Sequence, residues 1–186
     1  MLFFLIGCQD ESAYQNQVQQ EINNRLKYLQ YNDESPFQQF EIPYRQPDYF
    51  PVDINYRVTA RIERLKERAY QSISTSDGKS QRYLEYARLH FHLNGADHQL
   101  LVLKPVGMGS SSVFFLAFAD DTSGQTTYGG GRYLDINIGK SDKLVLDFNL
   151  SYNPYCAYVP EYSCPLPPAD NIMNTSVLAG EKDFKK

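Results

Sequence analysis

Residues 52–63 read VDINYRVTARIE, and this stretch alternates between apolar and polar side chains without interruption. The apolar set is Val52, Ile54, Tyr56, Val58, Ala60 and Ile62. The polar set is Asp53, Asn55, Arg57, Thr59, Arg61 and Glu63. A period of two predicts a β-strand with one buried face and one solvated face. Such a strand is typical of an antiparallel sheet, because parallel strands are covered on both faces and are apolar throughout.

Six further segments have strand character, and short turn sequences separate them. The segments are 69–75, 82–93, 99–104, 112–118, 133–138 and 143–148. The turns include Asn94-Gly95 and Ser123-Gly124, which favour tight reversals of the chain. Regular short strands of this kind predict an α+β fold, mostly antiparallel β. We expect a meander that closes into a barrel-like or sandwich sheet.

One amphipathic helix is predicted ahead of the strands. Its apolar residues recur every three or four positions, at Tyr14, Val18, Ile22, Leu26 and Leu29. This spacing indicates a helix with a single buried face. The helix either lies against the sheet or acts as a tether that holds the domain away from a membrane.

The first eight residues, MLFFLIGC, resemble a bacterial lipobox, in which the chain is cut after Gly7 and lipid is attached to Cys8. The alternative is an apolar first strand with a buried thiol. On the lipobox interpretation, the chain divides into a signal segment, a lipidated cysteine with its helix or tether, one β-rich domain and a tail, at 1–7, 8–31, 32–182 and 183–186. We then expect an outer-membrane lipoprotein of the bacterial cell envelope, held to the membrane through lipid on Cys8 and facing the periplasm or the cell surface.

Composition limits the range of partners. A chain of 186 residues suits one domain with its own core. Its net charge of −4 provides no basic footprint, so nucleic acid is not an expected partner. The chain has 15 Tyr, 11 Phe and no Trp, which favours β-rich structure. Tyrosine-rich surfaces suit sugars or peptides as ligands, although aromatic residues also fill strands that bind nothing.

A glycine-rich loop is the first candidate for a ligand site. Gly129, Gly130 and Gly131 precede Arg132, and three glycines let backbone amides approach a ligand closely. Arg132 would then supply a counter-charge for an anion. Alternatively, the glycines form a tight crossover while Arg132 pairs with Asp147 or Asp121 and serves only the fold.

Acid/base chemistry would need a carboxylate near this loop. Asp147 lies near the end of the strand predicted at 143–148, and with Tyr128 and Arg132 it forms the candidate catalytic set. Further candidates for ligand binding follow directly in the sequence at Asn149, Tyr152 and Asn153. The chain has neither a nucleotide-binding phosphate loop nor a serine nucleophile elbow, so we expect no cofactor and no catalytic triad.

Two histidines are the candidates for metal binding. His90 and His92 flank Phe91 in a predicted strand, so their side chains share one face and could hold one ion together with His98 or Asp97. Histidines on a solvated strand face are more commonly free of metal, and the ligand count is short. We therefore expect no metal.

Cys156 and Cys164 remain after Cys8 is assigned to lipid. An even pair in an oxidising compartment predicts a disulfide that staples a proline-rich loop. Two reduced thiols, or a zinc site with further ligands, are the alternatives.

Several short motifs together resemble the C-terminal signature of the bacterial domain-of-unknown-function family 1684. They are Thr127-Tyr128, Gly130-Gly131-Arg132-Tyr133-Leu134, Leu146-Asp147-Phe148-Asn149, Tyr152-Asn153-Pro154, Cys156-Ala157, Cys164-Pro165-Leu166-Pro167-Pro168, Asn171 and Ala179-Gly180-Glu181-Lys182. The N-terminus resembles lipoprotein members from Bacteroidetes and Flavobacteria. The resemblance implies no activity. We expect a lipid-anchored envelope protein that binds a small ligand or has a structural role, and the alternative is an envelope enzyme using an Arg/Asp/Tyr site.

Overall fold

The described part of this computed structural model comprises residues 5–107 and 114–185, with side chains from residue 11 onward. Two helices come first, α1 (Leu5–Tyr31) and α2 (Pro36–Gln39). The main sheet is built from β1 (Arg57–Arg64), β2 (Tyr70–Ser74), β3 (Ser80–Leu93), β4 (Ala96–Pro105) and β7 (Lys143–Asp147). A second sheet contains β5 (Ala117–Phe118) and β6 (Arg132–Tyr133). Single 3₁₀ turns lie at η1 (Ile54–Tyr56), η2 (Phe148–Leu150), η3 (Tyr155–Ala157) and η4 (Ala169–Asn171).

All strands of the main sheet are antiparallel, and the long strand β3 organises them. β4 pairs along one edge of β3, while β2 and β1 share the other edge, and β7 adds to the outer edge of β1. The β3–β4 hairpin turns at Asn94 and Gly95, which both have positive φ, at 52° and 79°. That geometry is the one for which Asn-Gly is the preferred pair. The alternating pattern of 52–63 is realised from Arg57 onward, after the η1 turn.

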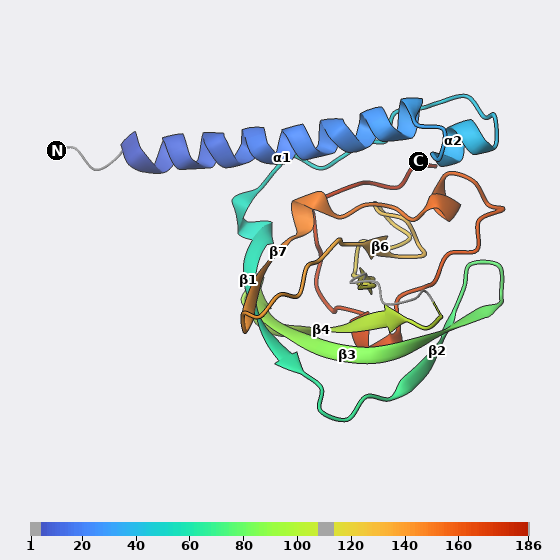
Figure 1. Cartoon of the computed structure of the whole chain (residues 1–186). Coiled ribbons are helices and arrows are strands. Elements are labelled where there is room, and N and C mark those ends of the chain that lie inside the picture. Colours follow the sequence, from blue (N-terminus) through green and yellow to red (C-terminus); the bar gives the residue numbers. More distant parts are fainter. Residues whose placement is uncertain (1–4, 108–113, 186) are drawn as a thin grey trace.

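The main sheet curves strongly but does not close into a barrel (Figure 1). Among the described strands, β4 and β7 remain separate edges, so the predicted barrel-like closure is not observed. Closure would need long strands from the C-terminal third of the chain, where only β7 exceeds two residues. This part is rich in glycine and proline, which interrupt strand pairing. Of the segment predicted at 112–118, residues 112 and 113 lie outside the described residues, and of the rest only Ala117–Phe118 form a strand, β5. Of the segment predicted at 133–138, only Tyr133 lies in a strand, β6.

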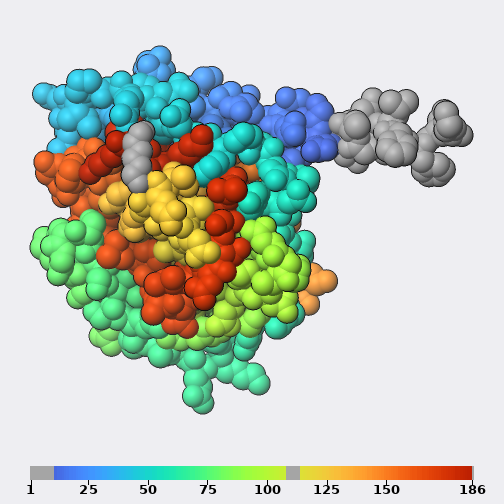
Figure 2. Space-filling model, turned by 180° about the vertical axis from the view of Figure 1, so that it is seen from behind, coloured from blue at the N-terminus to red at the C-terminus, as the bar shows by residue number. Residues whose placement is uncertain are grey.

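The irregular C-terminal part fills the concave side of the sheet. Ala60, Leu89 and Phe91 from the sheet pack in one hydrophobic cluster with Val177 and Ala179 near the end of the chain. Figure 2 shows this C-terminal part, in yellow to red, between α1 and the sheet. Burying apolar surface in this way contributes roughly 25 cal/mol per Å², so the loops are as much a part of the core as the strands.

Helix α1 lies across the side of the molecule opposite the sheet (Figure 1). Three residues of the predicted stripe, Val18, Ile22 and Leu29, are almost completely buried. The first turns of α1 extend past the domain and include the backbone of Cys8. Residues 1–4 of the expected signal segment, and the Cys8 side chain, lie outside the described residues. No described helix is both long enough and apolar enough to span a bilayer.

Candidate functional site

Arg132 lies in the interior of the protein, without exposure to solvent. Its side chain is fully buried, and Nη2 donates to Asp120 Oδ2 over 2.8 Å and to the Val177 carbonyl over 3.0 Å. Nη1 donates to the carbonyl of Ala179. Burial lowers the pKa of the guanidinium, and the neighbouring Asp120 carboxylate opposes that shift. The arrangement is a structural ion pair, although its partner is Asp120 and not Asp147 or Asp121.

The glycine loop has a packing role at two positions, since a Cβ at Gly130 would overlap the Tyr128 ring and Gly131 is more constrained still. Gly131 has a φ of 81°, and a Cβ there would overlap the Pro167 side chain and the carbonyl oxygen of Phe118. Gly129 and Gly130 have no positive φ. The loop therefore packs closely against Pro167 and Phe118, as the crossover interpretation requires. It also places Arg132 in the interior of the protein.

Asp147 and Asn149 fasten helix α1 to the sheet. Both carboxylate oxygens of Asp147 accept from the Tyr14 hydroxyl, over 3.0 and 2.8 Å. Asn149 Nδ2 donates to the same hydroxyl, to Asp147 Oδ1 and to the Asp53 carbonyl. Burial is the main cause that raises the pKa of Tyr14, and Asp147 adds to it. Asp147 thus has a structural partner, which is distinct from the partners of Tyr128 and Arg132.

The predicted disulfide between Cys156 and Cys164 is not formed, because both are free cysteines. Each sulfur has another partner: the Cys156 amide donates to Cys164 Sγ over 3.1 Å, and the Tyr128 hydroxyl donates to Cys156 Sγ over 3.7 Å. Hydrogen bonding from Cys164 is the main cause that lowers the pKa of Cys156 to about 6, with Ser76 and Tyr128 contributing. The pKa of Cys164 is raised in turn.

The histidines are paired with carboxylates. His90 Nε2 lies 2.6 Å from Glu63 Oε2, and His92 Nδ1 lies 2.9 Å from Asp97 Oδ1. Within the described residues, no group of three His, Cys, Asp or Glu side chains is arranged to hold a metal ion.

Tyr152 and Asn153, two of the predicted ligand-binding residues, contact Arg25 of α1 beside a cleft that was not predicted from the sequence. The guanidinium carbon of Arg25, on α1, lies 3.7 Å from the centroid of the Tyr152 ring. One Nη of Arg25 donates to the Asn153 carbonyl over 3.3 Å, and its buried Nε has no hydrogen-bond partner. Nε lies 4.0 Å from an oxygen of Glu181, the nearest carboxylate in this cluster.

Glu181 is the buried carboxylate of this cluster. It accepts hydrogen bonds from the Tyr158 hydroxyl over 2.6 Å, from the backbone N–H of Asn153 over 3.1 Å and from Asn153 Nδ2 over 2.8 Å. Burial raises the pKa of Glu181, while Arg25 and these hydrogen bonds oppose the shift. Glu181 thus holds Tyr158 and Asn153 in place and stabilises the positive charge of Arg25 against its loss of water.

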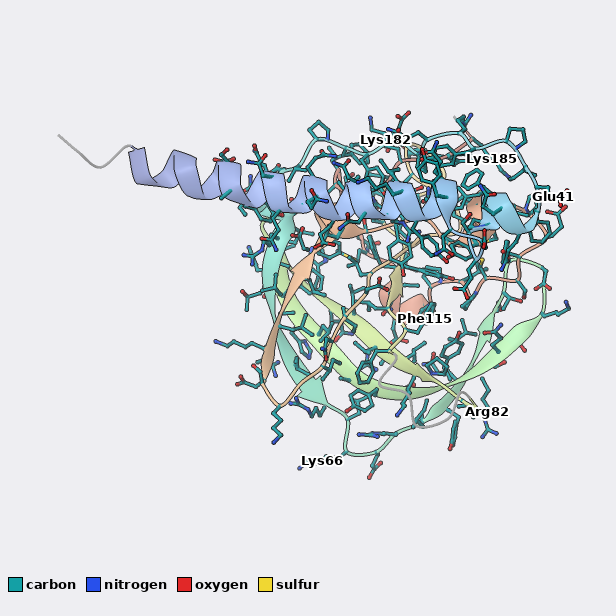
Figure 3. The ribbon with its side chains drawn as sticks, turned by 45° about the horizontal axis from the view of Figure 1, so that its top comes forward. Glu41, Lys66, Arg82, Phe115, Lys182 and Lys185 are labelled. Atoms are coloured by element: carbon teal, nitrogen blue, oxygen red, sulfur yellow. The ribbon has the colours of Figure 1, made fainter. Side chains whose placement is uncertain are left out.

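Two cavities meet at Arg25 and Tyr152. The first has a volume of about 420 Å³ and lies between α1 and the C-terminal part, with Glu21, Asn24, Tyr28, Tyr49 and Asp135 among its other lining residues. The second has a volume of about 340 Å³ and is lined by Tyr133, Tyr155, Tyr162 and Cys164 among others. We call the two together the tyrosine cleft. Figure 3 shows the neighbouring C-terminal residues Lys182 and Lys185 on the same side of the molecule as α1.

Arg25 carried a signal in the sequence. It follows Ile22 by three positions and precedes Leu29 by four, so it lies close to the apolar stripe of the helix. A charged residue at the border of a buried stripe needs a partner or a ligand. The partner could not be read from the sequence, because Glu181 lies near the other end of the chain.

Comparison with known proteins identifies the family of this chain. Residues 43–182 match the family described as protein of unknown function (DUF1684). The chain belongs to this family. The match begins after α2, so the DUF1684 segment contains Tyr152, Asn153 and Glu181, whereas Arg25 precedes it.

The same architecture occurs in an uncharacterized protein of Haloarcula marismortui whose structure was solved by NMR in solution. The TM-score is 0.71 at 32% sequence identity, and the alignment covers 96% of this DUF1684 chain and 99% of the other. No curated protein matches the sequence. The aligned share extends to nearly the whole chain, so the fold is shared well beyond the segment that the family match covers.

Proposed function

We propose that this DUF1684 protein is a binding module for a small, uncharged, polyhydroxylated ligand such as a sugar. The ligand would occupy the tyrosine cleft, with its ring against the tyrosine side chains. The observation that carries the proposal is the Arg25 guanidinium, which is stacked on Tyr152 and lines both cavities.

The chemistry of the lining supports this ligand class. Ligand sites combine apolar and aromatic walls with a few polar groups that fix orientation. Here the walls are tyrosine rings. Arg25 and the Tyr28 hydroxyl, which accepts from Tyr155, are donors, and the carboxylates of Glu21 and Asp135 are acceptors. Among the described residues, Arg25 is the one cationic side chain lining the cleft, and three carboxylates, those of Glu21, Asp135 and the nearby Glu181, lie in or beside it. This excess of negative charge disfavours an anionic ligand. A ligand with many hydroxyl groups can both donate and accept.

The alternative of an enzyme has less support. The three candidate acid/base groups have separate partners: Asp147 bonds to Tyr14, Tyr128 bonds to Cys156, and Arg132 is buried with Asp120. A catalytic site requires such groups to meet at one reacting atom. The tyrosine cleft contains none of these three residues in its lining.

A matched pair of helix variants tests the binding proposal. Asn23 and Asn24 are both exposed on α1, and each accepts one hydrogen bond from the glutamine four residues earlier, but only Asn24 lines the cleft. Asn24→Trp should fill the cavity, whereas Asn23→Trp adds the same side chain outside it.

The measurement is saturation-transfer NMR against glucose, N-acetylglucosamine and trehalose, with gluconate and glucosamine as charged counterparts. We expect at least one neutral sugar to bind the parent protein and Asn23→Trp but not Asn24→Trp. The proposal would be refuted if none of the three neutral sugars bound the parent protein, or if a sugar bound equally to both variants.

We further propose that the protein acts at the bacterial cell envelope, anchored by lipid on Cys8. The support is the sequence MLFFLIGC and its resemblance to a lipobox. Because α1 continues from the region of Cys8 into the domain, the helix would set the distance between membrane and cleft. Expression in a bacterium with labelled palmitate should give a labelled protein, and Cys8→Ala should abolish the label. Equal labelling of the Cys8→Ala variant would exclude this anchor.

A further inference from the structure

A row of polar residues crosses four neighbouring strands on the outer face of the sheet. Arg61 on β1 lies directly opposite Lys143 on β7 and opposite His90 on β3, and His90 lies opposite Gln99 on β4. Residues paired in this way project from the same face of a sheet and lie close together. The residues that alternate with them, such as Ala60 and Leu89, face the core.

Three residues of this row, Arg61, His90 and Lys143, line an open cavity that is separate from the tyrosine cleft. The cavity has a volume of about 610 Å³, and its other polar lining residues are Thr59, His92, Asp97 and His98. It is the largest of the cavities described above, and it has no lining residue in common with the tyrosine cleft.

The carboxylates near the row are engaged by its histidines. Glu63 pairs with His90, and Asp97 pairs with His92. Within the described residues, no ion pair joins Arg61 or Lys143 to a carboxylate. Arg61 and Lys143 are cross-strand neighbours, and neither is ion-paired with a carboxylate of the described residues, in a chain whose net charge is −4.

Such an arrangement has an energetic cost in the unliganded protein. Like charges directly opposite each other destabilise a sheet. An oxyanion between them would relieve the repulsion. Guanidinium groups bind phosphate in a bidentate manner, and lysine adds a point charge. Thr59 lies two residues before Arg61 on the same face, so its hydroxyl is a further donor.

We propose that this outer-face cavity binds the phosphate group of a small phosphorylated ligand. Arg61 and Lys143 hold the phosphate oxygens, and Thr59 contributes a neutral hydrogen bond. The site is independent of the tyrosine cleft, so either proposal can fail without the other.

The test is a ¹H–¹⁵N NMR titration of the full chain with inorganic phosphate, in which sodium chloride keeps the ionic strength constant. We expect saturable shifts confined to the amides of β1, β3 and β7 around Thr59, His90 and Lys143. Arg61→Gln and Lys143→Gln should each weaken phosphate binding by about tenfold or more, as expected for loss of a charge-assisted contact.

Lys66→Gln is the control, because it removes the same charge from the exposed β1–β2 connection, outside the lining of this cavity. Figure 3 shows Lys66 at the end of the sheet. The site variants replace side chains on a solvated face, and circular dichroism verifies that they fold. The proposal is overturned if phosphate causes no saturable shift, if chloride alone reproduces the shifts, or if Lys66→Gln weakens binding as much as Arg61→Gln.

Discussion

Replacing Arg132 with methionine tests whether this residue belongs to the fold and not to a ligand site. Methionine has a comparable length but cannot bond to Asp120, Val177 and Ala179. Both side chains of the ion pair are fully buried, so the variant leaves the Asp120 carboxylate without its cation. Removing one partner of a buried ion pair costs about 3–5 kcal/mol. In a chain of this size that corresponds to a fall in Tm of roughly 6–20 °C.

The assay is urea unfolding followed by circular dichroism, carried out on Arg132→Met, Asp120→Asn and the double variant. If the pair is coupled, the double variant should lose much less stability than the sum of the two single variants. The structural interpretation of Arg132 would be wrong if Arg132→Met lost less than about 1 kcal/mol, which is within the range of an exposed pair. Additive losses would show that Asp120 is not its partner.

Three further predictions concern other parts of the chain. Tyr14→Phe removes the hydroxyl that bonds to Asp147 and should lower the free energy of unfolding in urea by about 1–3 kcal/mol; a loss below about 0.5 kcal/mol would contradict the contact. Gly180→Ala should lower Tm, because φ is 78° and the new Cβ would overlap Ser151 Oγ; an unchanged Tm would refute this. The Cys156 ¹³Cβ chemical shift should titrate near pH 6, because the pKa of this thiol is lowered from its ordinary value of 9.0. Its thiolate therefore contributes stability fully above pH 9, and this contribution is lost as pH falls through 6. A titration midpoint near pH 9 would contradict the hydrogen bonding at Cys156.

The regular half of the fold could be predicted from local patterns. The helical stripe placed Val18, Ile22 and Leu29 on one face, and all three are buried. Alternation predicted the sheet face of Ala60 and Ile62, which also lie in the core. These predictions succeed because period and burial are linked within a single element, whatever the rest of the chain does.

The candidate site could be predicted only in part, because its partners are distant in the sequence. Tyr152 and Asn153 were found as polar residues in a turn, but their contacts depend on Arg25 and Glu181. The predicted barrel-like closure was not confirmed, and the reason is related. Arg132 and its neighbours are held by bonds from side chains to distant carbonyls, and such bonds leave no periodic trace in the sequence.

The contact between α1 and the C-terminal part has a consequence for biosynthesis. Arg25 is translated before Glu181, which balances its charge and comes about 150 residues later. Because ribosomes add roughly 5–20 residues per second, about 10–30 s separate the synthesis of Arg25 from that of Glu181. During that time α1 must remain exposed with its apolar stripe uncovered. Fragments expressed without α1, or without the last few residues, are therefore expected to aggregate or require chaperones, even when they contain every strand of the sheet.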